Sequence, residues 1–203
     1  NGYDGVARRA VPINGRYIRG FCCPDYAGKA TEPEGERIYK VYLSPSDQGK
    51  NTYAWGDTNE RDQMRKVADV TEQALLRTGR FMVINGQHGD MYDRIAESNA
   101  WEADLHVCNH SNACNGVVMG TRAFAYDLDG KGYEAVKAIY ERVAPLSPGT
   151  SENIKTATFR EIVLTSCPCA YVEVEFHDSE VGAKWITEHT EDIAEAICLG
   201  ICD

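Results

Sequence analysis

The segment DLHVCNHSNAC, residues 104–114, joins a short apolar run to a group of polar side chains. Leu105 to Val107 form the apolar run, and His110 stands between Cys108 and Cys114. Apolar runs of this kind are typical of buried strands in parallel sheets, so the segment predicts a strand that ends at His110. At this point His110 could be a metal ligand, the cysteines could be ligands too, or a disulfide could close the turn around an idle histidine.

The segments on either side alternate between strand and helix patterns. Apolar and β-branched residues predict strands at 37–43, 81–84, 104–110, 117–126, 160–165 and 170–176. Helical spacing of apolar residues predicts helices at 59–78, 91–101, 132–144 and 180–200, the first beginning at Thr58 or Asp57 and ending at Gly79. This alternation predicts an α/β fold with a mostly parallel, twisted sheet and helices on both faces.

The domain organisation follows from the same patterns. Residues 1–36 are rich in glycine, proline and charge and show no period, so they are interpreted as an N-terminal extension. Residues 37–203 are interpreted as a single folded domain. With 203 residues and 43% hydrophobic residues, the chain can bury a sizeable core.

The net charge of −10 argues against two classes of partner. An acidic chain without a cluster of lysine and arginine is a poor match for nucleic acid or an anionic membrane surface. No apolar run approaches the roughly 20 residues that span a bilayer. We therefore expect neither nucleic acid binding nor a membrane span.

Eight cysteines are many for this length, and two interpretations compete. The favoured one is a secreted protein with up to four disulfides, and the other is a reduced protein with structural thiols or a metal. The pairing cannot be deduced from the sequence, in which the cysteines occur as close pairs: Cys22/Cys23, Cys108/Cys114, Cys167/Cys169 and Cys198/Cys202.

Polar side chains with useful chemistry follow three of the predicted strands. Asp47 and Gln48 come after the first strand, His110 closes the third, and Glu173 and His177 lie at the end of the last. In open α/β sheets, functional groups gather beyond the carboxyl ends of the strands, so we expect these residues to lie close together.

The order of several motifs resembles the zinc-dependent N-acetylmuramoyl-L-alanine amidases of the type 3 family. The resemblance covers about residues 38–201, and the matching segments are YLSPSDQGKNTYAWGDTNE (42–60), RIAESNAWEADLHVCNHSNA (94–113), VEVEFHD (172–178) and IAEAICLGI (193–201). It implies a zinc-exopeptidase-like architecture. It also implies cleavage of the amide between N-acetylmuramic acid and L-alanine in peptidoglycan or muropeptides, outside the cell or at the cell wall.

The resemblance also implies roles for individual residues. Zinc is held in that family by His, Glu and His, which makes Glu60 the metal carboxylate and His110 a metal imidazole here. Glu173 becomes the general base that takes a proton from water. Asn112 is expected to orient the loop of His110, supported from the preceding helix by Arg94 and Asn99.

One departure concerns the first metal histidine. The family carries it in a G-H-G-G turn, whereas this chain reads SPSDQGKN, with Asp47 at that place without gaps and Gln48 after a one-residue shift. The last strand reads E-V-E-F-H in place of the family's E-x-G-F-L. We therefore predict that His177 completes the metal site, with Asp47 or Gln48 as a weaker ligand or water-orienting group. Glu175 shares a face with Glu173 and competes for the base role.

Two other functions remain as alternatives. The missing turn histidine favours a catalytically inactive wall- or glycan-binding module that kept the amidase fold. The thiols favour an intracellular metal-binding protein, in which Cys108 or Cys114 would ligate the ion.

Overall fold

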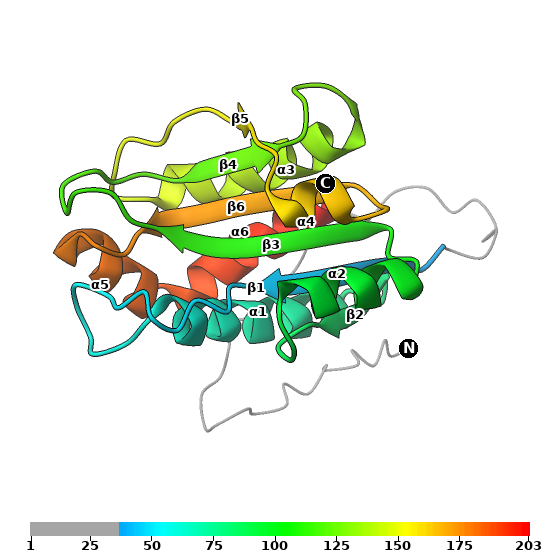
Figure 1. Cartoon of the computed structure of the whole chain (residues 1–203), viewed down its shortest axis with the longest axis horizontal. Coiled ribbons are helices and arrows are strands. Elements are labelled where there is room, and N and C mark those ends of the chain that lie inside the picture. Colours follow the sequence, from blue (N-terminus) through cyan, green and yellow to red (C-terminus); the bar gives the residue numbers. More distant parts are fainter. Residues whose placement is uncertain (1–36) are drawn as a thin grey trace, which may run out of the picture. The chain divides into compact units, whose positions relative to one another are not determined.

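The computed structural model describes residues 37–203, so the predicted extension at 1–36, with Cys22 and Cys23, lies outside the described residues. Six strands form one sheet in the order β2-β1-β3-β6-β4-β5 (Figure 1). Their bounds are β1 Tyr39–Pro45, β2 Phe81–Asn85, β3 Leu105–Asn112, β4 Arg122–Ala125, β5 Lys155–Thr156 and β6 Cys169–Phe176. The pairs β1–β2, β1–β3 and β3–β6 are parallel, β4 runs antiparallel to β6, and β5 pairs parallel with β4. The predicted mostly parallel sheet is confirmed.

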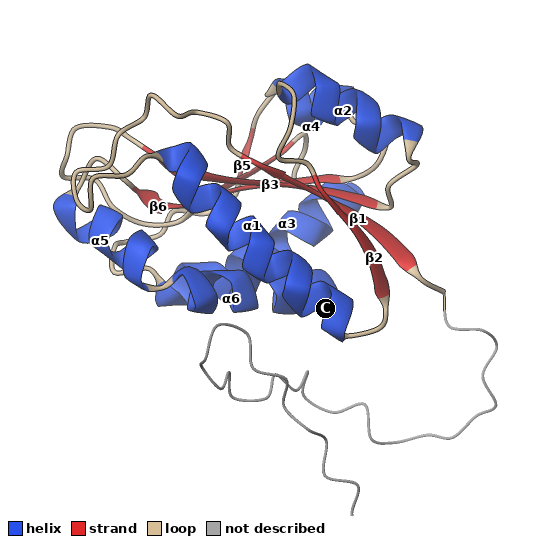
Figure 2. Ribbon diagram, turned by 90° about the horizontal axis from the view of Figure 1, so that it is seen from below, coloured by secondary structure: helices blue, strands red, loops and turns tan. Residues whose placement is uncertain are grey.

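Helices cover both faces of this sheet (Figure 2). On one face lie α1 (Glu60–Arg77), α3 (Gly130–Val143) and α6 (Thr190–Cys202), with α5 (Glu180–Glu188) packed near the end of β6. On the other face lie α2 (Met91–Ala100) and α4 (Arg160–Leu164), and a 3-10 turn at Ala144–Leu146 follows α3. The main core packs apolar side chains of β1, β3 and β6 against α1, α3 and α6.

Two predicted elements differ from the structure. Residues 160–165 were predicted as a strand, but Arg160–Leu164 form the short helix α4, because a short apolar run does not distinguish a strand from a helical turn. The single helix predicted at 180–200 is two helices, α5 and α6, which meet at His189, where φ is −117° and ψ is 29°. The short strand β5 carries too few residues to show a pattern.

The start of α1 also differs from the prediction, because Asn59 is the N-cap and not Thr58 or Asp57. The Asn59 side chain accepts a hydrogen bond from the backbone N–H of Asp62 at 3.0 Å. The Glu60 backbone N–H donates to the Asn51 carbonyl at 2.9 Å. Glu60 is therefore fixed as the first residue of α1, and its side chain is fully buried.

No helix within residues 37–203 combines the length and apolar character needed to cross a membrane.

We predict that Asn59→Ala lowers the free energy of unfolding by about 1 kcal/mol, because the Asp62 amide loses its capping acceptor. Urea unfolding of both proteins measures the difference. Asp129→Ala is the matched control, because Asp129 is the N-cap of α3 but its side chain makes no capping hydrogen bond. Equal losses in the two variants would show that the Asn59 side chain contributes nothing specific as a cap.

Candidate functional site

His110 lies at the centre of a polar cluster at the carboxyl end of β3. Its Nδ1 is 2.9 Å from Oε1 of Glu60 and 3.4 Å from Nε2 of Gln48. Its ring stacks on Tyr171 of β6, with 4.6 Å between the ring centroids. The structure thus brings together Glu60, His110 and Gln48, which come from α1, β3 and the loop after β1.

Glu60 is held as a buried carboxylate. Burial by itself would raise the pKa of Glu60, but the hydrogen bond with His110, the His110 charge and the hydrogen bond from Asn51 together lower this pKa below its usual value. Asn51 donates through Nδ2 to Oε2 of Glu60 at 2.7 Å. Glu60 therefore offers a charged oxygen directly beside an imidazole nitrogen.

Glu173 lies opposite His110 in the parallel pairing of β3 with β6, and Asn112 donates a hydrogen bond to its Oε2. Burial raises the pKa of Glu173 to about 7, against the opposing charges of His110 and Arg122. A carboxyl group with a pKa near neutral pH can accept and return a proton, which suits it to general acid–base chemistry. Asn112 thus orients the side chain of the predicted base.

The loop after β1 separates the two residues that could replace the turn histidine. Oδ2 of Asp47 lies 3.3 Å from the guanidinium of Arg94, which also donates to the Pro45 carbonyl at 2.7 Å. Gln48 instead faces His110, and its Oε1 accepts from Asn51 at 3.0 Å. Of Asp47 and Gln48, it is therefore Gln48 that contacts the Glu60–His110 pair.

Arg94 and Asn99 support other segments than the loop of His110. Arg94 fixes the loop after β1, through the contacts just described. Asn99 holds the end of α4, because its Nδ2 donates to the Leu164 carbonyl at 2.9 Å and its Oδ1 accepts from the Ser166 N–H at 2.7 Å. In this structure the two residues position the two segments that flank the site.

His177 lies after β6, where the chain turns as expected, but its side chain contacts a different group. Its Nδ1 is 2.8 Å from Oγ of Ser111, and its ring stacks on Tyr53 at 5.1 Å. Within residues 37–203, the donor atoms of Glu60, His110 and His177 do not all lie within 4.8 Å of one another. Ser111 follows His110 on the strand, and successive side chains point to opposite faces. The structure therefore does not gather His177, Glu60 and His110 into one compact set of donor atoms, although the charge of Glu60 acts on the His177 ring.

Glu161 is a site residue that the sequence analysis missed. Its Oε2 lies 3.9 Å from Nε2 of His110, on the side away from Glu60. Burial opposes its ionisation, but contacts with His106, His110 and the Ser44 hydroxyl hold the pKa of Glu161 below its usual value. In the sequence, Glu161 is only an acidic residue next to an apolar run. It was missed because residues 160–165 were predicted as a strand and not as the helix α4.

A cavity of about 500 Å³ opens beside His110. Its lining combines polar groups with aromatic surface, and includes Gln48, His110, Phe159, Arg160, Glu161 and Tyr171. A cavity of this size holds a small molecule or one segment of a polymer. The cluster around His110 therefore faces a space that a substrate can enter.

The cysteines of the site region are thiols in this structure. Cys108, Cys114, Cys167 and Cys169 form no disulfide, so the predicted disulfide framework is not seen for these four residues. Cys108 and Cys169 are buried, whereas Cys114 is exposed in the loop after β3. The thiols therefore do not staple the loop of His110.

Comparison with known proteins agrees with this fold. The catalytic domain of an N-acetylmuramoyl-L-alanine amidase from Bacillus (Paenibacillus) polymyxa is similar to this chain, with a TM-score of 0.73, 16% identity, and a match over 81% of this chain and 96% of that chain. An N-acetylmuramoyl-L-alanine amidase of Nostoc punctiforme has a TM-score of 0.72 and 19% identity, over 81% of this chain and 95% of that chain. An N-acetylmuramoyl-L-alanine amidase from Clostridium difficile 630 has a TM-score of 0.69 and 16% identity, over 82% of this chain and 96% of that chain. Identities this low establish a shared fold. No curated protein sequence matches the chain significantly.

The decisive match is to a family model. The model described as N-acetylmuramoyl-L-alanine amidase matches residues 41–203, which extend from within β1 to the end of α6. The chain therefore belongs to the N-acetylmuramoyl-L-alanine amidase family.

Proposed function

We propose that this chain hydrolyses the amide bond between N-acetylmuramic acid and L-alanine in peptidoglycan or its muropeptide fragments. The observation that carries the proposal is the pairing of Glu60 with His110 at 2.9 Å, with Glu173 opposite His110 on the adjacent strand. Family membership supplies the substrate class. Because this substrate is the cell wall polymer, the proposed site of action is the wall, outside the cell membrane.

The donor set near His110 fits a zinc ion held by Glu60, His110 and Gln48. A catalytic zinc takes nitrogen and oxygen ligands from three protein side chains and leaves a position open. Glu60 supplies a carboxylate oxygen and His110 an imidazole nitrogen. Gln48 would ligate through its amide oxygen, which requires its side chain to turn, because here Nε2 faces His110 at 3.4 Å and Oε1 accepts from Asn51. Zinc at this position supplies Lewis-acid chemistry, because it polarises a carbonyl oxygen and lowers the pKa of water.

Glu173 performs the proton transfers in the proposed reaction. Its carboxylate accepts a proton from the attacking water and returns it to the nitrogen of the leaving L-alanine, which balances the hydrolysis. Asn112 holds one carboxylate oxygen of Glu173, so the other remains available for the proton. Glu175 does not compete for this role, because its Oε1 accepts from the backbone N–H groups of Gly120 at 2.6 Å and Phe176 at 2.8 Å.

We predict that His110→Ala lowers the zinc content by about one ion per chain, because the ion loses its imidazole ligand. Elemental analysis of the purified proteins measures this. His88→Ala is the matched control, since His88 is exposed and pairs with Glu97 away from the cluster. An unchanged zinc content in His110→Ala would show that His110 does not bind the ion.

We predict that Glu173→Gln slows muropeptide cleavage by roughly 10²–10⁴-fold and keeps the zinc, because the amide is nearly isosteric but cannot accept a proton. In the unmodified protein, the rate should fall about tenfold per pH unit below pH about 7, where the raised pKa of Glu173 leaves the base protonated. Glu175→Gln should retain this acidic limb of the pH profile.

Two outcomes would contradict this assignment. Near-normal cleavage by Glu173→Gln would place the base elsewhere. Binding of muropeptides by the unmodified, zinc-loaded protein without any cleavage would favour the inactive wall-binding module.

A further inference from the structure

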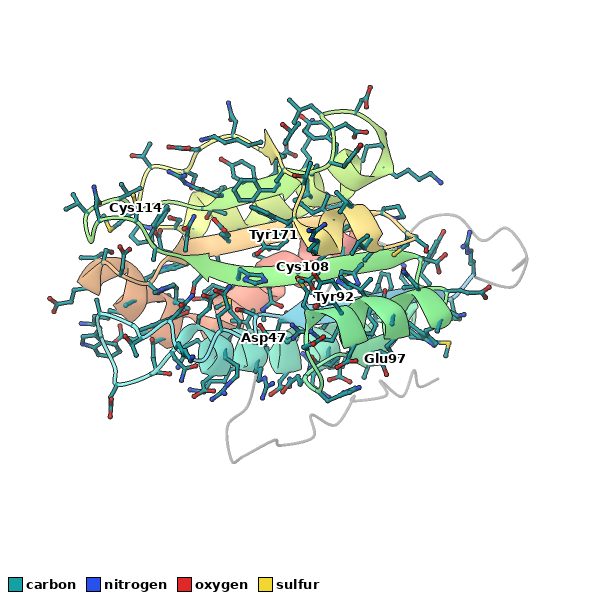
Figure 3. The ribbon with its side chains drawn as sticks, viewed as in Figure 1. Asp47, Tyr92, Glu97, Cys108, Cys114 and Tyr171 are labelled. Carbon is teal, nitrogen blue, oxygen red and sulfur yellow. The ribbon has the colours of Figure 1, made fainter. Side chains whose placement is uncertain are left out.

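A second cluster of metal-binding side chains lies on the same face of the sheet, toward the amino ends of β3 and β6. His106 and Cys108 of β3 are fully buried, and Glu161 of α4 and Cys169 of β6 are 3% and 5% exposed. Figure 3 shows Cys108 over the middle of β3, beside Tyr171 and between α2 and α4. None of the roles proposed above uses Cys108 or Cys169.

The sheet register explains why these side chains meet. His106 and Cys108 are two residues apart on β3, so they project from the same face. His106 pairs with Cys169 in the parallel β3–β6 ladder, which brings the second thiol to this patch. The helix α4 packs over this part of the sheet and places the Glu161 side chain next to it.

The distances between donor atoms match those in a tetrahedral zinc site. Among residues 37–203, His106, Cys108 and Glu161 form the one group of three such donors that all lie within 4.8 Å of one another. His106 Nε2 is 3.4 Å from Glu161 Oε1, and the Sγ atoms of Cys108 and Cys169 are 3.7 Å apart. Around a tetrahedral zinc, bond lengths of about 2.0–2.3 Å separate nitrogen from oxygen by about 3.4 Å and two sulfurs by about 3.8 Å.

Outer hydrogen bonds hold the two non-sulfur donors in place. Ser98 Oγ is 3.0 Å from Nδ1 of His106, which leaves Nε2 to face Glu161. The Ser44 hydroxyl donates to the Glu161 carboxylate. Metal-binding imidazoles characteristically use the second ring nitrogen in this way, which fixes the tautomer and the ring orientation.

We propose that His106, Cys108 and Glu161 bind a structural zinc ion that is separate from the ion proposed at Glu60 and His110, and that the Cys169 thiol, which lies outside this group of three but 3.7 Å from Cys108 Sγ, moves in as the fourth ligand. A closed set of nitrogen, oxygen and sulfur ligands is typical of structural zinc. The ion ties α4 to β3 and β6 and so fixes the cavity wall that carries Glu161. This inference does not depend on the amidase activity.

The test is titration of the reduced, metal-free full-length chain with Co²⁺. A thiolate ligand gives an intense near-ultraviolet charge-transfer band, whereas a Co²⁺ ion at Glu60, His110 and Gln48 has no sulfur ligand and gives none. We expect this band to saturate with about one Co²⁺ per chain and to disappear when zinc is added in excess. The thiolate band does not depend on amidase activity, so a chain that lacks the activity would still show the band. The two proposals can therefore fail independently of each other.

Variants assign the band to its ligands. Cys108→Ser should abolish it, and His110→Ala should retain it. Cys114→Ser is the matched control and should also retain the band, because Cys114 is exposed in the loop after β3, far from Cys108 in Figure 3. Cys169→Ser should weaken and shift the band, and serves as the second variant if Cys108→Ser does not fold.

Three outcomes would overturn the proposal. Persistence of the same band in folded Cys108→Ser would assign the band to other thiols. Absence of the band in the unmodified chain would show that no thiolate binds the ion. A Cys108–Cys169 disulfide, found by mass spectrometry in protein purified without reductant, would show that the two sulfurs serve as a covalent link.

Discussion

His110 and Glu173 stand opposite each other because β3 and β6 are parallel and in register. This pairing also places Tyr171 against the His110 ring and brings Cys169 beside His106. A slip of one residue would turn every side chain of one strand to the other face of the sheet. The buried Val172 and Val174 oppose such a slip, because it would move them out of the main core. The chemistry of the site therefore depends on the packing of the opposite face.

The contact between Glu60 and His110 connects the two faces of the sheet. Glu60 begins α1, which packs on the main core, whereas His110 points toward the face that carries α2 and α4. Both side chains are buried, so removal of one partner leaves the other without its hydrogen-bond partner, at a cost of about 1–3 kcal/mol. Asn59 and Asn51 fix the Glu60 backbone and side chain before any ligand binds. The oxygen and nitrogen donors are thereby preorganised.

Local patterns in the sequence were sufficient for the strands β1, β2, β3 and β6 and for the helix α1, because alternation and helical spacing report burial directly. The motifs brought Glu60, His110 and Glu173 into one hypothesis, and the structure places them together. The direction of loop side chains was not accessible in this way. Asp47 turns to Arg94 through a contact between residues 47 positions apart, and His177 turns to Ser111. Neither contact leaves a periodic signal in the sequence.

The replacement of the family's turn histidine becomes understandable when the charges are considered. By resemblance, that histidine is a neutral ligand, and the Gln48 amide that now faces His110 is neutral too. Asp47 would add a negative charge beside the ionised Glu60, which would raise the pKa of nearby Glu173 further. Its pairing with the buried Arg94 directs that charge away from the pair. The loop after β1 therefore adds no negative charge beside Glu60, and the pKa of Glu173 is about 7, near neutrality, where a general base is effective.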